Sequence, residues 1–374
     1  MATVDRAHLS KFQPRVELPQ SRSLPLEKRL GRVLVTGANG FVGSNLTASL
    51  LTMGVETVAA VRPGRTLPNE IASRCGEVTY RTIDFQSVPS LVQTLEGVDT
   101  IVHSAGRVSA RNYREFLETN RNATLHLFEA ASRLKKPPRI LLISSIAASG
   151  PRTGDQVRST DDRPEPISLY GRSKLAGESV ARRFAKQLPI TILRPGIIFG
   201  PGDHEVLRLI KMIAKTHINF IPGYHRPRFP FIAVQDLVTC IIKAIDVGGI
   251  LFPSKELNSE GSHQGEGVYF AADSQFLSFA QFGRWVSKSL GQRWELSIPI
   301  PLRTLRNAAR IHARFLSDPE RPSTFSVDKI REAAAKGWEC DVSKTMHELS
   351  WSPAALLEER LRETIHWYRQ HDWI

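Results

Sequence analysis

The stretch VLVTGANGFVGSN, residues 33–45, decides the fold of this chain. It begins with apolar and β-branched residues, which are typical of a buried parallel strand and predict one over 32–36. Gly37, Gly40 and Gly43 then lead into a helix expected over 41–53. A helix N-terminus at the carboxyl end of a strand attracts a phosphate through its N–H groups and its dipole. We therefore predict a dinucleotide-binding turn, the alternative being an ordinary tight strand–helix turn.

The following residues, up to about 200, repeat the alternation of strand and helix. Short apolar runs predict strands over 57–61, 78–83, 100–103, 139–144 and 190–194. Helices are expected between them, over 87–95, 113–134 and 169–187. Such alternation is typical of right-handed βαβ units. The sequence thus predicts an α/β fold with a Rossmann-type, doubly wound parallel sheet.

The pattern loosens after Gly200. Strands are expected over 231–234 and 268–271, and helices over 203–215, 236–245, 278–290, 301–316, 326–334 and 355–370. We predict an N-terminal extension (1–29), a dinucleotide-binding domain (30–200, with 231–285 returning to it) and a smaller, mostly helical substrate lobe (201–230 and 286–374).

Composition narrows the classes of partner. The 374 residues carry a formal charge of +13, which suits anionic ligands. No basic stripe with interleaved aromatics and no zinc-finger spacing occurs, so we expect no nucleic acid and no metal. The three cysteines, Cys75, Cys240 and Cys340, form no C-x-x-C pair, which favours a reducing compartment. The N-terminus lacks the apolar core of a secretory signal and no run of eighteen apolar residues occurs, so we expect a cytoplasmic protein.

Tyr170 and Lys174 form the second informative pattern. Residues four apart share one helix face, and an ammonium near a phenol lowers the phenol pKa. Tyr170 would then serve as a general acid or base, although the same spacing also occurs as a solvated helix pair. Ser144 and Ser145 end the strand expected at 139–144, where such sheets hold ligands, so either could bind a substrate oxygen or merely cap a turn.

These segments together resemble the extended short-chain dehydrogenase/reductase superfamily, also called the NAD-dependent epimerase/dehydratase family. Residues 36–43 match its T-G-x-x-G-F-[IV]-G turn, 103–106 its H-x-A-[AG] segment, Asn120 the asparagine of its central helix, and 193–203 its L-R-P-x-x-[IV]-[YF]-G-P-G run. The family's serine lies five residues before a glycine, which selects Ser145 because Gly150 ends this segment. The resemblance implies a catalytic set of Ser145, Tyr170 and Lys174.

The resemblance also implies how the site works. Lys174 would bind the nicotinamide ribose and hold the pKa of Tyr170 down, while Ser145 and Tyr170 bind the reacting oxygen and hydride passes between cofactor and substrate. The implied cofactor-binding residues are Gly37, Asn39, Gly40, Phe41, Val42, Gly43, Arg62, Asp84, Phe85, Ser104, Ala105, Gly106, Tyr170, Lys174, Pro195 and Ile197. Family members often dimerise through the helices expected near 113–134 and 169–187, so a homodimer is expected. A dinucleotide-binding protein without catalysis is the alternative from another class.

Arg62 bears on the choice of cofactor. NAD-preferring sites place an acidic residue at the end of the second strand, on the ribose 2′-hydroxyl. Here the strand is followed by Arg62, which suits a 2′-phosphate. We expect NADP(H), with NAD(H) as the alternative if Arg62 instead stacks on adenine.

Two departures from the sequence pattern of nucleotide-sugar enzymes bear on the substrate. Phe229 stands where nucleotide-sugar enzymes often carry an arginine, and Gly196 stands where many of them have asparagine. Both favour the branch that resembles dihydroflavonol reductases and 3β-hydroxysteroid dehydrogenases. We expect interconversion of a ketone and a secondary alcohol, the alternative being a nucleotide-sugar epimerase or dehydratase with tightly bound NAD. Six residues could line an apolar pocket or belong to the core: Phe220, Ile221, Pro222, Tyr224, Phe229 and Phe231.

The segment 301–316 reads as a basic amphipathic helix. Leu302, Leu305, Ala309 and Leu316 recur at helical spacing, with arginines between them. We expect a lobe helix with a solvated basic face, and the alternative is a helix that lies on an anionic membrane surface.

Overall fold

A seven-stranded parallel sheet forms the centre of the larger part of the molecule. In the computed structural model, residues 24–68, 78–253, 265–315 and 325–374 are described; the expected extension up to residue 23, Cys75 and Leu316 lie outside these ranges. The strand order is β10-β6-β5-β4-β1-β2-β3. The strands are β1 (Val33–Thr36), β2 (Thr57–Val61), β3 (Thr79–Thr82), β4 (Thr100–His103), β5 (Arg139–Ile143), β6 (Ile190–Pro195) and β10 (Val268–Ala271). This arrangement confirms the predicted Rossmann-type fold.

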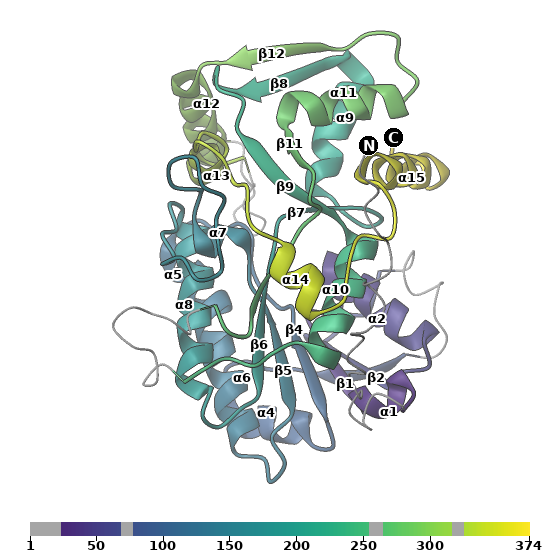
Figure 1. The fold of residues 1–374 in the computed structure, drawn as a ribbon, viewed down its shortest axis with the longest axis vertical. Helices are drawn as coiled ribbons and strands as arrows, with labels where there is room; N and C mark the ends of the chain where they lie inside the picture. The colour runs from purple at the N-terminus through teal and green to yellow at the C-terminus, as the bar shows by residue number, and fades with distance from the viewer. Residues whose placement is uncertain (1–23, 69–77, 254–264, 316–324) are drawn as a thin grey trace, which may run out of the picture.

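Helices cover both faces of this sheet (Figure 1). Successive side chains of a strand point to opposite faces, so β1 supplies Val33 and Val35 to one core and Leu34 to the other. The first core packs against α1 (Leu26–Leu30), α2 (Phe41–Thr52) and α10 (Val234–Val247), and the second against α4 (Val88–Leu95), α6 (Ala123–Ser132) and α8 (Leu169–Phe184). Because both faces are covered, β1 and β2 are buried along their whole length and, apart from Thr36 and Thr57, are apolar rather than alternating.

The single helix expected over 113–134 is not regular. It consists of α5 (Tyr113–Leu117), a π-helical turn η2 (Glu118–Asn122) and α6, which ends at Ser132. A π-helical turn admits one extra residue and commonly occurs at functional sites. Here it contains the buried Asn120, whose side chain holds the loop that follows β4.

The second part of the molecule packs above the carboxyl ends of the strands. It contains a three-stranded sheet of β7 (Ile197–Phe199), β9 (Arg228–Ala233) and β11 (Phe276–Ser278), and a two-stranded ribbon of β8 (Ile218–Pro222) and β12 (Leu296–Ile300). Its helices are α9 (Glu205–Thr216), α11 (Phe279–Ser289), α12 (Leu302–Phe315), α13 (Val327–Ala333), α14 (Ser343–Glu348) and α15 (Leu357–Gln370). Its core is rich in aromatics: the rings of Phe231 and Phe282 stack at 4.7 Å.

The chain crosses between these two parts more than once. The strand expected at 231–234 is β9, which begins at Arg228 and joins the three-stranded sheet, whereas α10 and β10 return to the large sheet. The helices of the C-terminal region are as predicted. The two small sheets in this part of the molecule were not predicted. The exact division into domains stays a prediction.

Candidate active site

The glycine turn after β1 has the geometry of a dinucleotide cradle. Gly37 has a φ of +66°, which an L side chain rarely adopts. A Cβ on Gly43 would lie 2.2 Å from the carbonyl oxygen of Gly37, so only glycine lets the first turn of α2 pack this closely on the strand. The turn residues line a cavity of about 1220 Å³. Glycines and a helix N-terminus facing a cavity fit the pyrophosphate of a dinucleotide.

The turn lies where the direction of the sheet reverses. β1 pairs with β2 on one side and with β4 on the other, so the chain connections leave in opposite directions and open a crevice at the strand ends. Thr36 and His103, at these ends, join through a 2.8 Å contact between Thr36 Oγ1 and His103 Nδ1. The Ser104 hydroxyl donates to the Thr36 carbonyl at 2.7 Å. These contacts hold one wall of the crevice.

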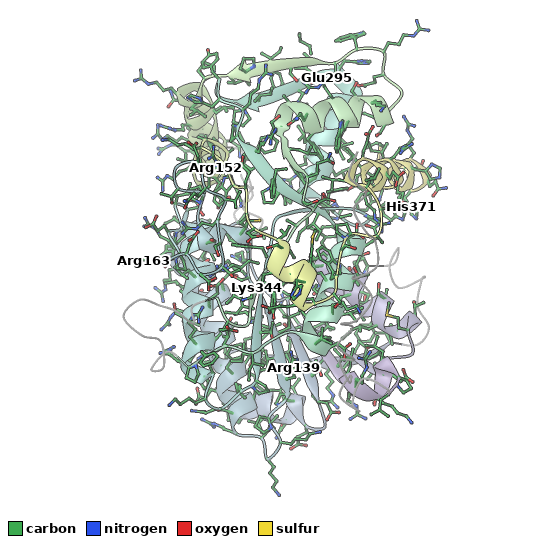
Figure 2. The ribbon with its side chains drawn as sticks, in the orientation of Figure 1. Arg139, Arg152, Arg163, Glu295, Lys344 and His371 are labelled. Carbon is green, nitrogen blue, oxygen red and sulfur yellow. The ribbon has the colours of Figure 1, made fainter. Side chains whose placement is uncertain are left out.

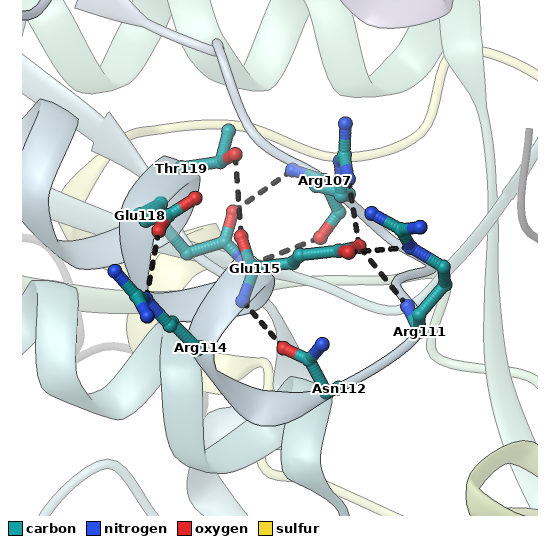
Figure 3. A network of polar contacts seen from close by, with 8 residues as sticks. Arg107, Arg111, Asn112, Arg114, Glu115, Glu118 and Thr119 are labelled. Atoms are coloured by element: carbon teal, nitrogen blue, oxygen red, sulfur yellow. Dashed lines mark hydrogen bonds and ion pairs between the residues drawn. The ribbon is translucent and has the colours of Figure 1, made fainter. Parts of the chain in front are cut away.

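Asn120 and Glu115 fix the loop that follows β4, and Figure 3 shows Glu115 with its arginine partners. The Asn120 side chain accepts from the backbone N–H of Arg107 at 2.8 Å and donates to its carbonyl at 3.0 Å. The carboxylate of Glu115 binds both Arg107, at 3.2 Å, and Arg111, at 2.5 Å. The loop between these residues carries Val108, which lines the cavity.

Ser145 and Tyr170 come together at the floor of the cavity. Ser145 is the N-cap of the short helix α7 (Ile146–Ser149), and its Oγ accepts from the N–H of Ala147 at 3.2 Å. Tyr170 lies in the first turn of α8, which begins after the cap Ser168. Both side chains line the cavity, and the Ser145 hydroxyl lies near enough to Tyr170 to oppose the rise that burial causes in the pKa of its phenol. An oxygen placed between them would meet two hydroxyl donors.

Ser144 points elsewhere. Its hydroxyl donates at 2.5 Å to Glu178, which also forms a buried ion pair with Arg194 at 2.7 Å. Burial opposes ionisation of Glu178, but Arg194 and Ser144 hold the pKa of this carboxyl below its usual value. The geometry therefore favours Ser145 over Ser144 as the residue that meets substrate.

Lys174 differs from the sequence expectation. Its Nζ donates to the carbonyl of Ile143 at 2.6 Å, and burial lowers its pKa to about 8. The pKa of Tyr170 is raised by burial, not lowered, and the cation that opposes this shift is Lys329 rather than Lys174. Lys174 is thus not among the groups that shift the pKa of Tyr170, and its ammonium binds a backbone carbonyl; its expected role beside a cofactor stays a prediction.

Lys329 of α13 was not foreseen as a site residue. Its Nζ lies 4.5 Å from the centroid of the Tyr170 ring and 2.7 Å from the carboxylate of Glu332. Burial opposes the charge, but Glu332 and Tyr170 raise the pKa of Lys329 above its ordinary value, so it stays protonated. The only sequence signal was a helix expected at 326–334, since nothing in the spacing links it to residue 170.

Asp328 connects α13 to the catalytic helix. Its two carboxylate oxygens accept from the N–H groups of Leu169 at 2.9 Å and Tyr170 at 3.2 Å. Glu332 accepts from the Ser168 hydroxyl at 2.5 Å. The first turn of α8 is thus satisfied partly by a helix from the other part of the molecule.

The expected cofactor residues fall into two groups. Those that line the cavity are Gly37, Asn39, Gly40, Phe41, Val42, Gly43, Ser104, Gly106, Tyr170 and Ile197. Those outside its lining are Arg62, Asp84, Phe85, Ala105, Lys174 and Pro195. Arg62 and Asp84 are exposed just past the ends of β2 and β3, beside the crevice edge. Their contacts with a cofactor stay predictions.

The far wall of the cavity is apolar. Phe220, Ile221, Pro222 and Phe229 line it as expected, together with Leu209, Met212, Phe279, Ile300, Leu305, Phe325, Trp338 and Trp367. Two expected pocket residues do not: Phe231 is buried in the core, and Tyr224 is exposed outside the lining. Among the described residues that line the cavity, none is an arginine, and Lys329 is the one lysine.

The model of the NAD dependent epimerase/dehydratase family matches residues 33–250. The chain therefore belongs to this family, the extended short-chain dehydrogenases/reductases, and is an NAD(P)-dependent enzyme of the oxidoreductase type.

Its relatives differ in their substrates. The 3 beta-hydroxysteroid dehydrogenase/Delta 5-->4-isomerase of Mycobacterium tuberculosis is 25% identical over 92% of each chain. The ceramide reductase of Caulobacter vibrioides is 26% identical over 92% of this chain and 96% of its own. The UDP-glucose 4-epimerase of Vibrio cholerae is 25% identical over 90% and 95%. Among solved structures, MoeE5 in complex with UDP-glucuronic acid and NAD superposes with a TM-score of 0.68 at 25% identity, over 91% of this chain and 100% of that one.

Proposed function

We propose that this enzyme interconverts a ketone and a secondary alcohol on an apolar substrate, with NADP(H) as the cofactor. The observation that carries the proposal is that the hydroxyls of Ser145 and Tyr170 both face one cavity with an apolar wall. The names of two relatives support an apolar substrate. One is a hydroxysteroid dehydrogenase and the other is a ceramide reductase.

The chain's own residues have separate roles in the proposed reaction. Ser145 and Tyr170 bind the carbonyl oxygen of the ketone, and Tyr170 donates its phenolic proton as charge develops there. Lys329, above the ring, stabilises the phenolate that remains. The nicotinamide, when bound, supplies or accepts the hydride. The apolar wall excludes water and orients the substrate.

Arg62 supports NADP(H) over NAD(H). It follows β2, the strand beside the glycine turn, and it is exposed. A guanidinium in this place suits a 2′-phosphate, whereas an NAD site would favour a carboxylate.

The alternative is a nucleotide-sugar epimerase or dehydratase. It is favoured by the likeness to UDP-glucose 4-epimerase and to a structure that holds a UDP-sugar. It is disfavoured because a nucleotide diphosphate needs cations, and no described arginine lines the cavity.

Absorbance at 340 nm separates the two candidates. A reductase consumes NADPH in proportion to ketone, whereas an epimerase leaves the cofactor unchanged at the end of each turnover. We expect NADPH consumption with hydrophobic ketones, such as steroid or long-chain ketones, and none with UDP-sugars. Tyr170→Phe should abolish turnover while NADPH still binds, as measured by fluorescence. Epimerisation of a UDP-sugar without net change in cofactor would overturn the proposal.

A further inference from the structure

One face of the ribbon of β8 and β12 is apolar and stays partly exposed. The two strands are parallel, with Ile218 opposite Leu296, Phe220 opposite Ile298 and Pro222 opposite Ile300. Residues paired in this way point to the same face, so all six apolar side chains share it. All six are at least partly exposed, Phe220 to 40% and Leu296 to 52%. The ribbon lies at the end of the molecule farthest from the large sheet (Figure 1).

Helix α12, which follows β12, adds a second exposed apolar strip. Leu302, Leu305 and Ala309 form its more buried side. On another side, Ala308, Ile311 and Phe315 follow helical spacing, and Ile311 and Phe315 are 57% and 72% exposed. Large apolar side chains of this exposure are costly in water unless something covers them.

The same region is strongly basic. Residues 291–315 contain five arginines, Arg293, Arg303, Arg306, Arg310 and Arg314, and a single acidic residue, Glu295, which lies at this end of the molecule in Figure 2. On α12 the four arginines recur at successive helical turns, on the side of the helix that lies between its buried side and the apolar strip. Cations flanking exposed apolar side chains match the layered chemistry of an anionic bilayer, with phosphates outside and acyl chains inside.

The same face of the ribbon also leads into the cavity. Phe220, Pro222 and Ile300 of the ribbon and Leu305 of α12 line the cavity that contains Tyr170. Phe220 is both exposed and part of the lining, so apolar surface continues from outside to inside. An apolar substrate could pass along it without entering water.

We propose that β8, β12 and α12 form a docking surface for an anionic lipid bilayer, on which the enzyme lies as a peripheral protein. Ile311, Phe315, Leu296 and Phe220 enter the acyl boundary, and the arginines of α12 contact lipid phosphates. No helix among the described residues is both long and apolar enough to cross a bilayer, so the attachment is to the surface. Only the passage of substrate from the bilayer rests on the proposed function; docking itself does not.

Co-sedimentation of the full-length protein with vesicles tests the proposal. We expect the protein to sediment with vesicles of two-thirds phosphatidylcholine and one-third phosphatidylglycerol at low salt, and at least tenfold less with pure phosphatidylcholine. Ile311→Ser/Phe315→Ser should weaken binding at least tenfold because it removes the inserted side chains. Arg310→Glu/Arg314→Glu should abolish the preference for anionic vesicles.

Two controls make the outcome interpretable. Met53→Ser/Ile250→Ser removes two exposed apolar side chains outside β8, β12 and α12 and should bind vesicles like wild type. Thermal unfolding should match in all variants. NADPH consumption with a water-soluble ketone, measured without vesicles, should be unchanged in Ile311→Ser/Phe315→Ser, so loss of docking and failure of the proposed reaction are distinguishable. No sedimentation with anionic vesicles, or self-association that this variant abolishes without vesicle binding, would overturn the proposal.

Discussion

The position of Lys329 changes the expected chemistry of the active site, because this lysine, rather than Lys174, acts on the ionisation of Tyr170. A cation 4.5 Å above the Tyr170 ring favours the phenolate over the phenol, against the effect of burial. Glu332 is the other charge that bears on this ring, and it acts in the opposite sense, whereas the Lys174 ammonium binds the carbonyl of Ile143.

We predict that Lys329→Met shifts the basic pKa of kcat/KM for alcohol oxidation upward by about one unit, since an opposite charge at this range shifts a pKa by about 1–3 units. Lys329→Arg keeps the cation and should restore the wild-type profile. The measurement is kcat/KM at rising pH up to the limit at which the folded protein is stable, because burial raises the pKa of Tyr170 above its ordinary value. A profile unchanged in Lys329→Met would show that the lysine is only structural.

Arg62 permits a prediction about cofactor choice. If it binds a 2′-phosphate, Arg62→Asp removes a charge-assisted hydrogen bond of about 1.5–3 kcal/mol and adds repulsion. The KM for NADPH should rise about 10- to 100-fold, since each 1.4 kcal/mol is tenfold, while that for NADH stays level or falls. Arg183→Asp, on the exposed side of α8, makes the same change in net charge and should leave both constants unaltered. Equal changes for both cofactors would contradict the role of Arg62.

The main elements were predictable because each carries its own local pattern. Six of the seven strands of the sheet are short, mainly apolar runs, and β1, the glycine turn and the start of α2 follow from thirteen consecutive residues. The exception is β3, expected to be buried, which lies at the edge of the sheet and is mostly exposed. β8 and β12 were missed because the two strands are far apart in the chain and six of their eight apolar residues lie on the partly exposed face. The π-helical turn was missed because it depends on how Asn120 holds a distant loop.

Helix α13 shows the same limit of prediction from sequence at the active site. Its existence follows from helical periodicity near 326–334, but its place above α8 depends on the whole chain. Asp328 satisfies two N–H groups in the first turn of α8. Losing such a cap costs about 1–2 kcal/mol.

Asp328→Ala should therefore lower the free energy of unfolding by about 1–2 kcal/mol, measured by urea denaturation. It should also lower kcat more than it raises the KM for NADPH, because it frees Tyr170 rather than the glycine turn. Asp328→Asn keeps one acceptor oxygen and should show a smaller effect on both quantities. An effect on stability with unchanged kcat would mean that α13 does not position the tyrosine.

The whole molecule is organised around the crevice between β1 and β4, and His103 lies at its base. The ring bridges Thr36, at 2.8 Å, and Thr124 of α6, at 3.1 Å, and is fully enclosed. Burial, and secondarily Lys174, lowers the pKa of His103 from 6.5 to about 3. The folded protein thus keeps this ring neutral at a pH where the unfolded chain protonates it.

The sign of the resulting pH dependence follows from linkage. A depressed pKa contributes stability that is present above pH 6.5 and is lost progressively as the pH falls toward 3. Between pH 7 and pH 5 the loss is about 2 kcal/mol, at about 1.4 kcal/mol per unit. Asp203 acts in the opposite sense, because burial raises its pKa to about 7 and acid relieves that cost. Asp203 is present both in wild type and in His103→Gln, so comparing the two proteins cancels the contribution of Asp203. The difference that remains is due to His103, because glutamine cannot titrate.

Urea unfolding at pH 7, 6 and 5 should therefore show wild-type stability falling relative to His103→Gln by about 2 kcal/mol over this range. At pH 7 the variant is expected to be less stable, because glutamine cannot reproduce both hydrogen bonds to the threonines. Parallel curves for the two proteins would mean that water reaches the ring when it is protonated. The crevice between β1 and β4 would then open in acid, and the cofactor site with it.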